Sequence, residues 1–259
     1  MSFHTDIVNS DIVSMFQSGI EAGKYCVCAR DGCIWNKQEL QGLDLAGIDF
    51  PWIFVNNPPD YFCQWQHDIA NLFGFIPTHC LNCWKVVVRP QNLQQLFQLL
   101  KLMEEMVAED PTCMCKCGTE PRPTVNGNYG GYFYNRSKEQ MQEKYKRVKK
   151  LVHRRIHPSI DVIPKRYCSE FEAKFGPSDK YEQAIHAQLW EPQIEEYCKM
   201  QKFPYQQPEI IKRKVIREWI KRAWDIGDPT VYEYTDGRPL TRPVVRYEPE
   251  EESRGESQE

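Results

Sequence analysis

Five cysteines at short spacing are the residues of this chain whose types and positions indicate chemistry most directly. Cys80 and Cys83 form a Cys-x-x-Cys pair before a run of β-branched residues, and Cys113, Cys115 and Cys117 follow later at every second position. Zn²⁺ prefers four tetrahedral thiolate or imidazole ligands, and two closely spaced pairs are a common way to supply them. The pattern therefore predicts a zinc site made by Cys80, Cys83, Cys115 and Cys117, with Cys113 as a spare ligand. An iron–sulfur cluster uses the same thiolates and is the alternative cofactor.

A second group of cysteines and a histidine gives a weaker signal. Cys26, Cys28 and Cys33 fall on a predicted hairpin, whereas Cys63 and His67 are four residues apart on a predicted helix and would share one of its faces. Together these residues would make a second metal site. A half-buried hairpin beside a core histidine explains the same pattern without a metal.

Cys168 is a candidate nucleophile. Lys165 and Arg166 precede it and would lower the pKa of its thiol, whereas Glu170 and Glu172 would act in the opposite direction. The local sequence names no base for this cysteine. Because of Cys168, a cysteine-dependent redox or transfer enzyme is an alternative function.

Cysteine usage also depends on the compartment. The 259 residues include eleven cysteines, no apolar run of transmembrane length, and an N-terminal stretch without the basic and apolar regions of a signal peptide. We therefore expect a cytoplasmic protein with no membrane partner, in which the thiols stay reduced and disulfides are not the framework. The hydrophobic share of 41% and the charged share of 27% are ordinary for a globular chain of this length, which can bury a substantial core.

Hydrophobic periodicity predicts the elements that must position these residues. Strand and helix patterns alternate from residue 84, with strands at 84–88, 130–134 and 160–167 and helices at 91–109 and 137–156. Ser137 and Gln140 form a capping box at the start of the second helix, and Pro164 indicates an edge position or an early end for the third strand. Strand, helix, strand, helix, strand is typical of two right-handed crossovers. The predicted fold class is therefore α/β, a parallel βαβαβ core with a metal-binding cysteine cluster at the N-terminal edge of the sheet and additional helices.

The chain divides into three predicted parts. Residues 1–74 are a helical and hairpin segment packed on the core, residues 75–227 are the α/β core with the metal site and the C-terminal helices, and residues 228–259 are an extended strap and an acidic tail. The tail ends in EPEEESRGESQE, which holds six Glu and one Arg and is typical of disorder.

Cations follow each predicted strand at its carboxyl end, where parallel sheets place their ligand sites. Arg89 follows the first strand, Arg136 and Ser137 follow the second, and Lys165 and Arg166 lie at the carboxyl end of the third. An edge with this composition suits an anion, most simply a phosphate. The sequence therefore predicts that these residues bind a phosphorylated ligand.

The middle of the chain is strongly basic although the net charge is −3. Residues 136–166 hold 11 Lys/Arg against 3 Asp/Glu, and the predicted nucleic-acid contacts on this helix are Lys146, Arg147, Lys149, Lys150, Arg154 and Arg155. The helix at 208–226 adds further cations around Trp219 and Trp224. We therefore expect a zinc-stabilised cytosolic protein that binds a phosphorylated small molecule or nucleic acid. The alternatives are an iron–sulfur or cysteine-dependent enzyme and an assembly protein that docks an acidic partner; the oligomeric state is not indicated.

Overall fold

A five-stranded antiparallel sheet forms the centre of the computed structural model. Its strands lie in the order β3-β5-β6-β4-β7, and every neighbouring pair is antiparallel. The predicted parallel βαβαβ core is therefore wrong, and the fold class is α+β rather than α/β. The residues that the structure describes are 21–22, 25–27, 34–36, 51–56, 66–67, 70, 74–122, 125–184, 187, 191–192 and 207–238.

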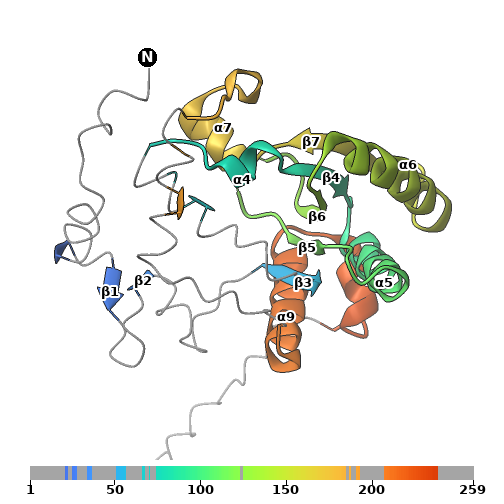
Figure 1. Ribbon diagram of the computed structural model, residues 1–259. Coiled ribbons are helices and arrows are strands. Elements are labelled where there is room, and N and C mark those ends of the chain that lie inside the picture. The colour runs from blue at the N-terminus through green and yellow to red at the C-terminus, as the bar shows by residue number, and fades with distance from the viewer. Residues whose placement is uncertain are drawn as a thin grey trace, which may run out of the picture.

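Figure 1 shows the elements along the chain. The strands of the sheet are β3 (Trp52–Asn56), β4 (Trp84–Arg89), β5 (Cys115–Thr119), β6 (Tyr129–Asn135) and β7 (Asp161–Arg166). The helices are α4 (Thr78–Leu81), α5 (Leu93–Glu109), α6 (Lys138–Arg155), α7 (Ser169–Phe175) and α9 (Glu209–Asp225), with 3₁₀ turns η1 (Ser178–Lys180) and η2 (Pro229–Tyr234). Strands β1 (Tyr25–Val27) and β2 (Ile34–Asn36) pair antiparallel, which confirms the predicted hairpin.

One strand hidden in the cysteine-rich segment explains the error in fold class. Cys115 and Cys117 lie on β5, which pairs with β6 in the register Cys115↔Phe133 and Cys117↔Gly131. Residues two apart on a strand point to the same face, so the alternation that resembled a ligand loop is the side-chain period of a buried strand. Because β5 reverses the chain before β6, β6 runs antiparallel to β4.

The element order β4-α5-β5-β6-α6-β7 is the split βαβ arrangement of ferredoxin-like topology. Strands β4 and β5 point in one direction with β6 inserted between them, and β7 pairs with the other side of β4. Strand β3 extends this sheet beyond β5. Residues 52–56 thus belong to the core sheet although they fall within the predicted N-terminal segment.

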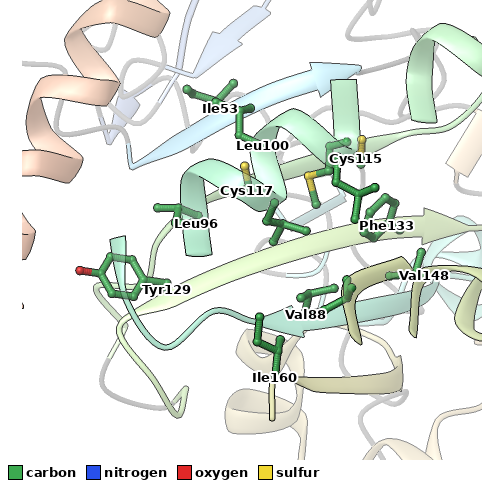
Figure 2. Packing of buried hydrophobic residues seen from close by; sticks show 14 of the residues in the cluster. Ile53, Val88, Leu96, Leu100, Cys115, Cys117, Tyr129, Phe133, Val148 and Ile160 are labelled. Atoms are coloured by element: carbon green, nitrogen blue, oxygen red, sulfur yellow. The ribbon is translucent and has the colours of Figure 1, made fainter. Parts of the chain in front are cut away.

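Helices α5, α6 and α9 cover one face of the sheet, called the helical face below (Figure 1). Helix α5 turns its leucines and methionines onto β5 and β6, and Figure 2 shows Leu96 and Leu100 close to Cys115, Cys117 and Phe133 in this core. The approach is closest at β6, where a Cβ added to Gly131 would lie 2.4 Å from Leu99 Cδ2. Glycine at that position lets α5 pack directly on the strand backbone.

The helix ends follow from local hydrogen bonds. Ser137 Oγ accepts from the Gln140 backbone N–H at 3.2 Å, which confirms Ser137 as the cap of α6. The reciprocal bond differs from a capping box, because Gln140 Oε1 accepts from the backbone N–H of Arg136, one residue before the cap, at 3.1 Å. Helix α9 begins after Pro208 and ends before Gly227, whose φ of 72° suits glycine.

Asp228 joins the turn after α9 to the core. Its carboxylate accepts from the Leu93 backbone N–H at 2.6 Å, from the Tyr129 hydroxyl at 2.5 Å and from the Thr230 backbone N–H at 2.9 Å. Burial acts to raise the pKa of Asp228, but these hydrogen bonds outweigh it and hold the pKa below its usual value. The predicted strap at 228–259 therefore begins as a 3₁₀ turn anchored to α5 and β6.

Both edges of the sheet have distinct features. Strand β7 forms one edge and contains Pro164, as predicted. At the other edge, the Gln207 side chain accepts from the Phe54 backbone N–H and donates to the Trp52 carbonyl, both at 3.1 Å.

Among the described residues, no helix combines the length and apolar character needed to cross a membrane.

Candidate functional site

The five thiols predicted to bind a metal occupy separate parts of the fold. Cys113, Cys115 and Cys117 lie in the core on the helical face, whereas Cys80 and Cys83 belong to two smaller clusters. In the part of the chain that the structure describes, none of the five belongs to a group of three or more metal-ligating side chains within 4.8 Å of one another. The structure therefore does not assemble the predicted zinc or iron–sulfur site.

Strand geometry explains why the two cysteine groups stay apart. Cys83 packs with Met114 and Tyr134, on the face of the sheet opposite the helical face. Met114 lies between Cys113 and Cys115, and neighbouring residues on an extended chain point to opposite sides. In the weaker group, Cys28, Cys33 and Cys63 fall outside the described residues.

The residues of the predicted anion site are divided between the two opposite ends of the strands. Arg89 pairs with Asp161 at one end of β4, whereas Trp84, at the other end, pairs with Arg166 and Asn135. Because β4 runs antiparallel to β6 and β7, Arg89 lies at the opposite end of the strands from the other predicted cations. A single site containing Arg89 and those cations is therefore wrong.

The remaining members of that predicted site have partners within the chain. Lys165 Nζ forms an ion pair with Glu172 at 2.7 Å, and Arg166 Nη2 donates to the Leu81 carbonyl at 2.8 Å. Ser137 caps α6 and therefore contributes to the helix. Lys165, Arg166 and Ser137 thus each have a partner within the fold.

A buried lysine on β4 leads to a different site. Val86 and Val88 face the core of the helical face, so Lys85 and Val87 point to the opposite face. Only 5% of Lys85 is exposed. Its Nζ donates to the Tyr167 carbonyl at 3.2 Å and to Cys168 Sγ at 2.9 Å. The buried ammonium is thus placed directly against a thiol.

The turn between β7 and α7 presents Cys168 to this lysine. Tyr167 has φ of 63°, a left-handed conformation that costs a bulky residue about 1–3 kcal/mol. The Tyr167 side chain is 1% exposed and packs edge-on against Tyr181, and its backbone N–H donates to the Cys83 carbonyl at 3.1 Å. This packing holds the turn and places Cys168 directly before the first residue of α7.

Two further side chains complete the group. Ligating atoms of His67, Cys168 and Glu170 all lie within 4.8 Å of one another. The His67 ring lies 4.5 Å from the ring of Phe171 on α7, measured between centroids. Glu170 also forms an ion pair with Arg122.

Arg122 is itself fixed by a buried network on β5 and β6. Its Nε lies 2.6 Å from Glu120 Oε1, and Glu120 Oε2 accepts from the Tyr132 hydroxyl at 2.7 Å. The Glu120 side chain has no exposed surface. Because hydrogen bonds to ionised groups are strong when they are shielded from water, this network gives the carboxylate of Glu170 a rigid partner.

The electrostatics of the group favour a thiolate. Burial acts to raise the pKa of Cys168, but the charge of Lys85 and hydrogen bonds from His67 and Lys85 outweigh it, and the pKa falls to about 6. Burial likewise acts to raise the pKa of Glu170, whereas its backbone hydrogen bond and Arg122 lower it below its usual value. At neutral pH the site therefore combines a thiolate and a carboxylate with the side chain of His67.

These three residue types suit either a metal ion or nucleophilic catalysis. Thiolate, imidazole and carboxylate are all zinc ligands, and three of them would leave a fourth position open. However, the Lys85 ammonium lies 2.9 Å from the sulfur that a dication would bind, and the two positive charges would repel each other. The same ammonium stabilises a free thiolate, so the arrangement fits a nucleophile better.

Sequence reasoning named Cys168 but missed the groups that activate it. Lys85 and His67 lower the pKa of Cys168, whereas Lys165, the cation named from sequence, pairs with Glu172. The signal for Lys85 was present, because a lysine within the apolar run WKVVV is unusual for a buried strand.

Comparison with known proteins gave no matching family model, no match among curated proteins and no match among solved structures.

Proposed function

We propose that this chain is an enzyme that uses Cys168 as the nucleophile in a transfer or hydrolysis reaction at an acyl carbon. The observation that carries the proposal is the contact of 2.9 Å between Lys85 Nζ and Cys168 Sγ, in a group that also brings His67 and Glu170 within 4.8 Å. A nucleophile, a base and a carboxylate that orients the base are the parts of a Cys-His-acid triad. The split βαβ topology adds no support, because one fold hosts many functions.

The proposed reaction has two steps. The Cys168 thiolate attacks the carbonyl carbon, a C–S bond forms, and the bond to the leaving group breaks as His67, which is protonated at the start of the cycle, donates its proton to that group. Water or an acceptor nucleophile then attacks the thioester while His67 removes its proton, and Cys168 leaves as the thiolate. Glu170 orients His67, and Lys85 stabilises the thiolate at the start and the end of the cycle.

Trapping of the acyl intermediate tests this proposal. The native protein is incubated with a panel of p-nitrophenyl esters and acyl thioesters, quenched in acid and digested with trypsin. Cleavage after Arg166 and Lys174 releases residues 167–174, a peptide in which Cys168 is the only cysteine. We expect an acyl mass on this peptide and release of p-nitrophenolate, both abolished in Cys168→Ser. His67→Ala should slow deacylation and increase the trapped fraction.

Matched variants and a chelator distinguish a catalytic triad from a zinc site. Glu170→Gln should lower turnover, whereas Glu172→Gln, on the same helix and paired with Lys165, should not. Chelator treatment should leave turnover unchanged if Cys168 is the nucleophile. The proposal is overturned if no ester acylates Cys168, or if activity disappears with chelator and returns with zinc.

A further inference from the structure

The solvent side of α6 carries the densest cationic surface of the described chain. Between residues 144 and 155 the sequence holds seven Lys/Arg and no Asp/Glu. Val148 and Val152 are fully buried on the other side of the helix, where they pack into the core of the helical face. The helical period therefore directs the polar side chains of this segment away from the sheet.

The cations of α6 fall into two classes. Those next to α5 have acidic partners on that helix or directly after it: Arg155 with Glu105 at 2.6 Å, Lys144 with Asp110 at 3.4 Å, and Arg147 with Glu109. Five exposed cations of α6 have no carboxylate partner within 4.0 Å among the described residues: Lys138, Lys146, Lys149, Lys150 and Arg154. Lys149 Nζ instead donates to the Tyr145 hydroxyl, whereas Lys146, Lys150 and Arg154 form a row with a spacing of four residues. We call these three residues the α6 stripe.

The geometry of the α6 stripe suits a phosphodiester chain. Its members are spaced four residues apart, so a rise of 1.5 Å per residue places successive members about 6 Å apart along the axis and extends the stripe over about 12 Å. A strand of duplex DNA carries one phosphate per 3.4 Å of axis, so the stripe can face several consecutive phosphates. Lys150 and Arg154 also line a hollow of about 270 Å³ between α5 and α6, together with Glu105 and Glu109, which pair with Arg155 and Arg147.

We propose that the α6 stripe binds the backbone of a nucleic acid without base specificity. Charge complementarity supports this, because the stripe presents three cations that have no acidic partner in the described part of the chain. The net charge of the chain is −3 and does not attract a polyanion, so the attraction comes from this local surface. A helix face that only contacts water would not need its cations divided into an ion-paired group and an unpaired group. The stripe lies on the helical side of the sheet, whereas Lys85 and Cys168 lie on the opposite face, so the proposal is independent of the proposed reaction.

Helix α9 supplies a matched control. Arg213, Arg217 and Lys221 are also exposed and also spaced four residues apart. On α9, however, Glu218 and Asp225 interrupt the cationic surface. Removing three charges from α9 changes the net charge as much as removing three from the α6 stripe, so a comparison of the two variants separates a local site from long-range attraction.

The experiment is fluorescence anisotropy with labelled 20-nucleotide single-stranded DNA, the corresponding RNA and a 20-base-pair duplex, in 50 to 200 mM KCl. The variants are Lys146→Gln/Lys150→Gln/Arg154→Gln and Arg213→Gln/Arg217→Gln/Lys221→Gln, each checked for native circular dichroism and urea midpoint. We expect the α6 variant to bind at least tenfold more weakly at 100 mM KCl, and the slope of log K against log [KCl] for the single strand to fall by about 2, because each lost phosphate contact removes about 0.7.

The α9 variant should stay within about twofold of the unmodified chain. Comparison of the three nucleic acids shows which backbone geometry the stripe prefers. The proposal is overturned if none of the three binds in 50 mM KCl, or if the two variants weaken binding equally.

Discussion

Replacing Lys85 by methionine is the most direct test of how Cys168 is activated. Methionine keeps the length and most of the volume of the side chain but removes the ammonium that lies 2.9 Å from Cys168 Sγ. Burial of the thiol and the hydrogen bond from His67 then act in opposite directions on its pKa. We expect the pKa of Cys168 to rise from about 6 to about 8.5, the value of an unperturbed cysteine.

The effect on reactivity changes sign with pH. At pH 6 the thiolate fraction falls from about one half to about 0.3%, but a thiolate of higher pKa is intrinsically more nucleophilic, by roughly tenfold for this change. The Lys85→Met variant should therefore react with iodoacetamide about tenfold more slowly than the unmodified chain at pH 6. At pH 9.5, where the thiol is almost fully ionised in both proteins, the variant should react about tenfold faster.

The assay follows carbamidomethylation of the tryptic peptide of residues 167–174 by mass spectrometry between pH 5 and pH 10. Lys165→Met is the matched control, because Lys165 neighbours Lys85 across β4 and β7 but pairs with Glu172. This control should keep the midpoint near 6. A midpoint that stays near 6 in Lys85→Met, or a variant that is slower at every pH, would refute the assignment of Lys85 as the activating group.

Three further predictions concern the core. Gly131→Ala should lower the free energy of unfolding by about 1–3 kcal/mol in urea, because the new methyl group would overlap Leu99; an unchanged midpoint would show that α5 moves away freely. Asp228→Ala should cost roughly 3 kcal/mol through the lost bond to Leu93 and its other partners. Because the folded pKa of Asp228 is lowered, its contribution is present above the unfolded value of about 3.9 and disappears as the pH falls through the folded value, so the wild-type and variant urea midpoints should converge in acid. Cys117 is 0% exposed and should remain unlabelled under native conditions that label Cys168; equal labelling would show that the core opens.

The elements with strong periodicity could be predicted from sequence, but their relative directions could not. Helices α5, α6 and α9 and strands β4, β6 and β7 lie close to the predicted ranges, because each has an apolar period or a cap that acts locally. Strand β5 was missed because cysteines at every second position can indicate ligands as well as a buried strand. Strand β5 reverses the chain before β6, so omitting it gives the wrong direction for β6 relative to β4. This one omission made the predicted sheet parallel, whereas the sheet is antiparallel.

The candidate site shows a different limit. Cys168 was identified from sequence because a thiol beside cations is a local pattern. His67 and Lys85 precede it by 101 and 83 positions in the chain, and only the pairing of β4 with β7 brings Lys85 to the turn after Tyr167. No local rule contains that register, so the activating groups could not be assigned without the structure.

The side-chain amide at the β3 edge has a consequence for how copies of this protein behave toward one another. An exposed strand normally offers its backbone to a strand from another molecule, which is a common start of aggregation. Gln207 engages the Phe54 amide and the Trp52 carbonyl as an added strand would. Gln207 therefore blocks the addition of a further strand at this edge. When the Gln207 side-chain amide is removed by mutation, concentrated protein should form intermolecular β-structure at this edge first.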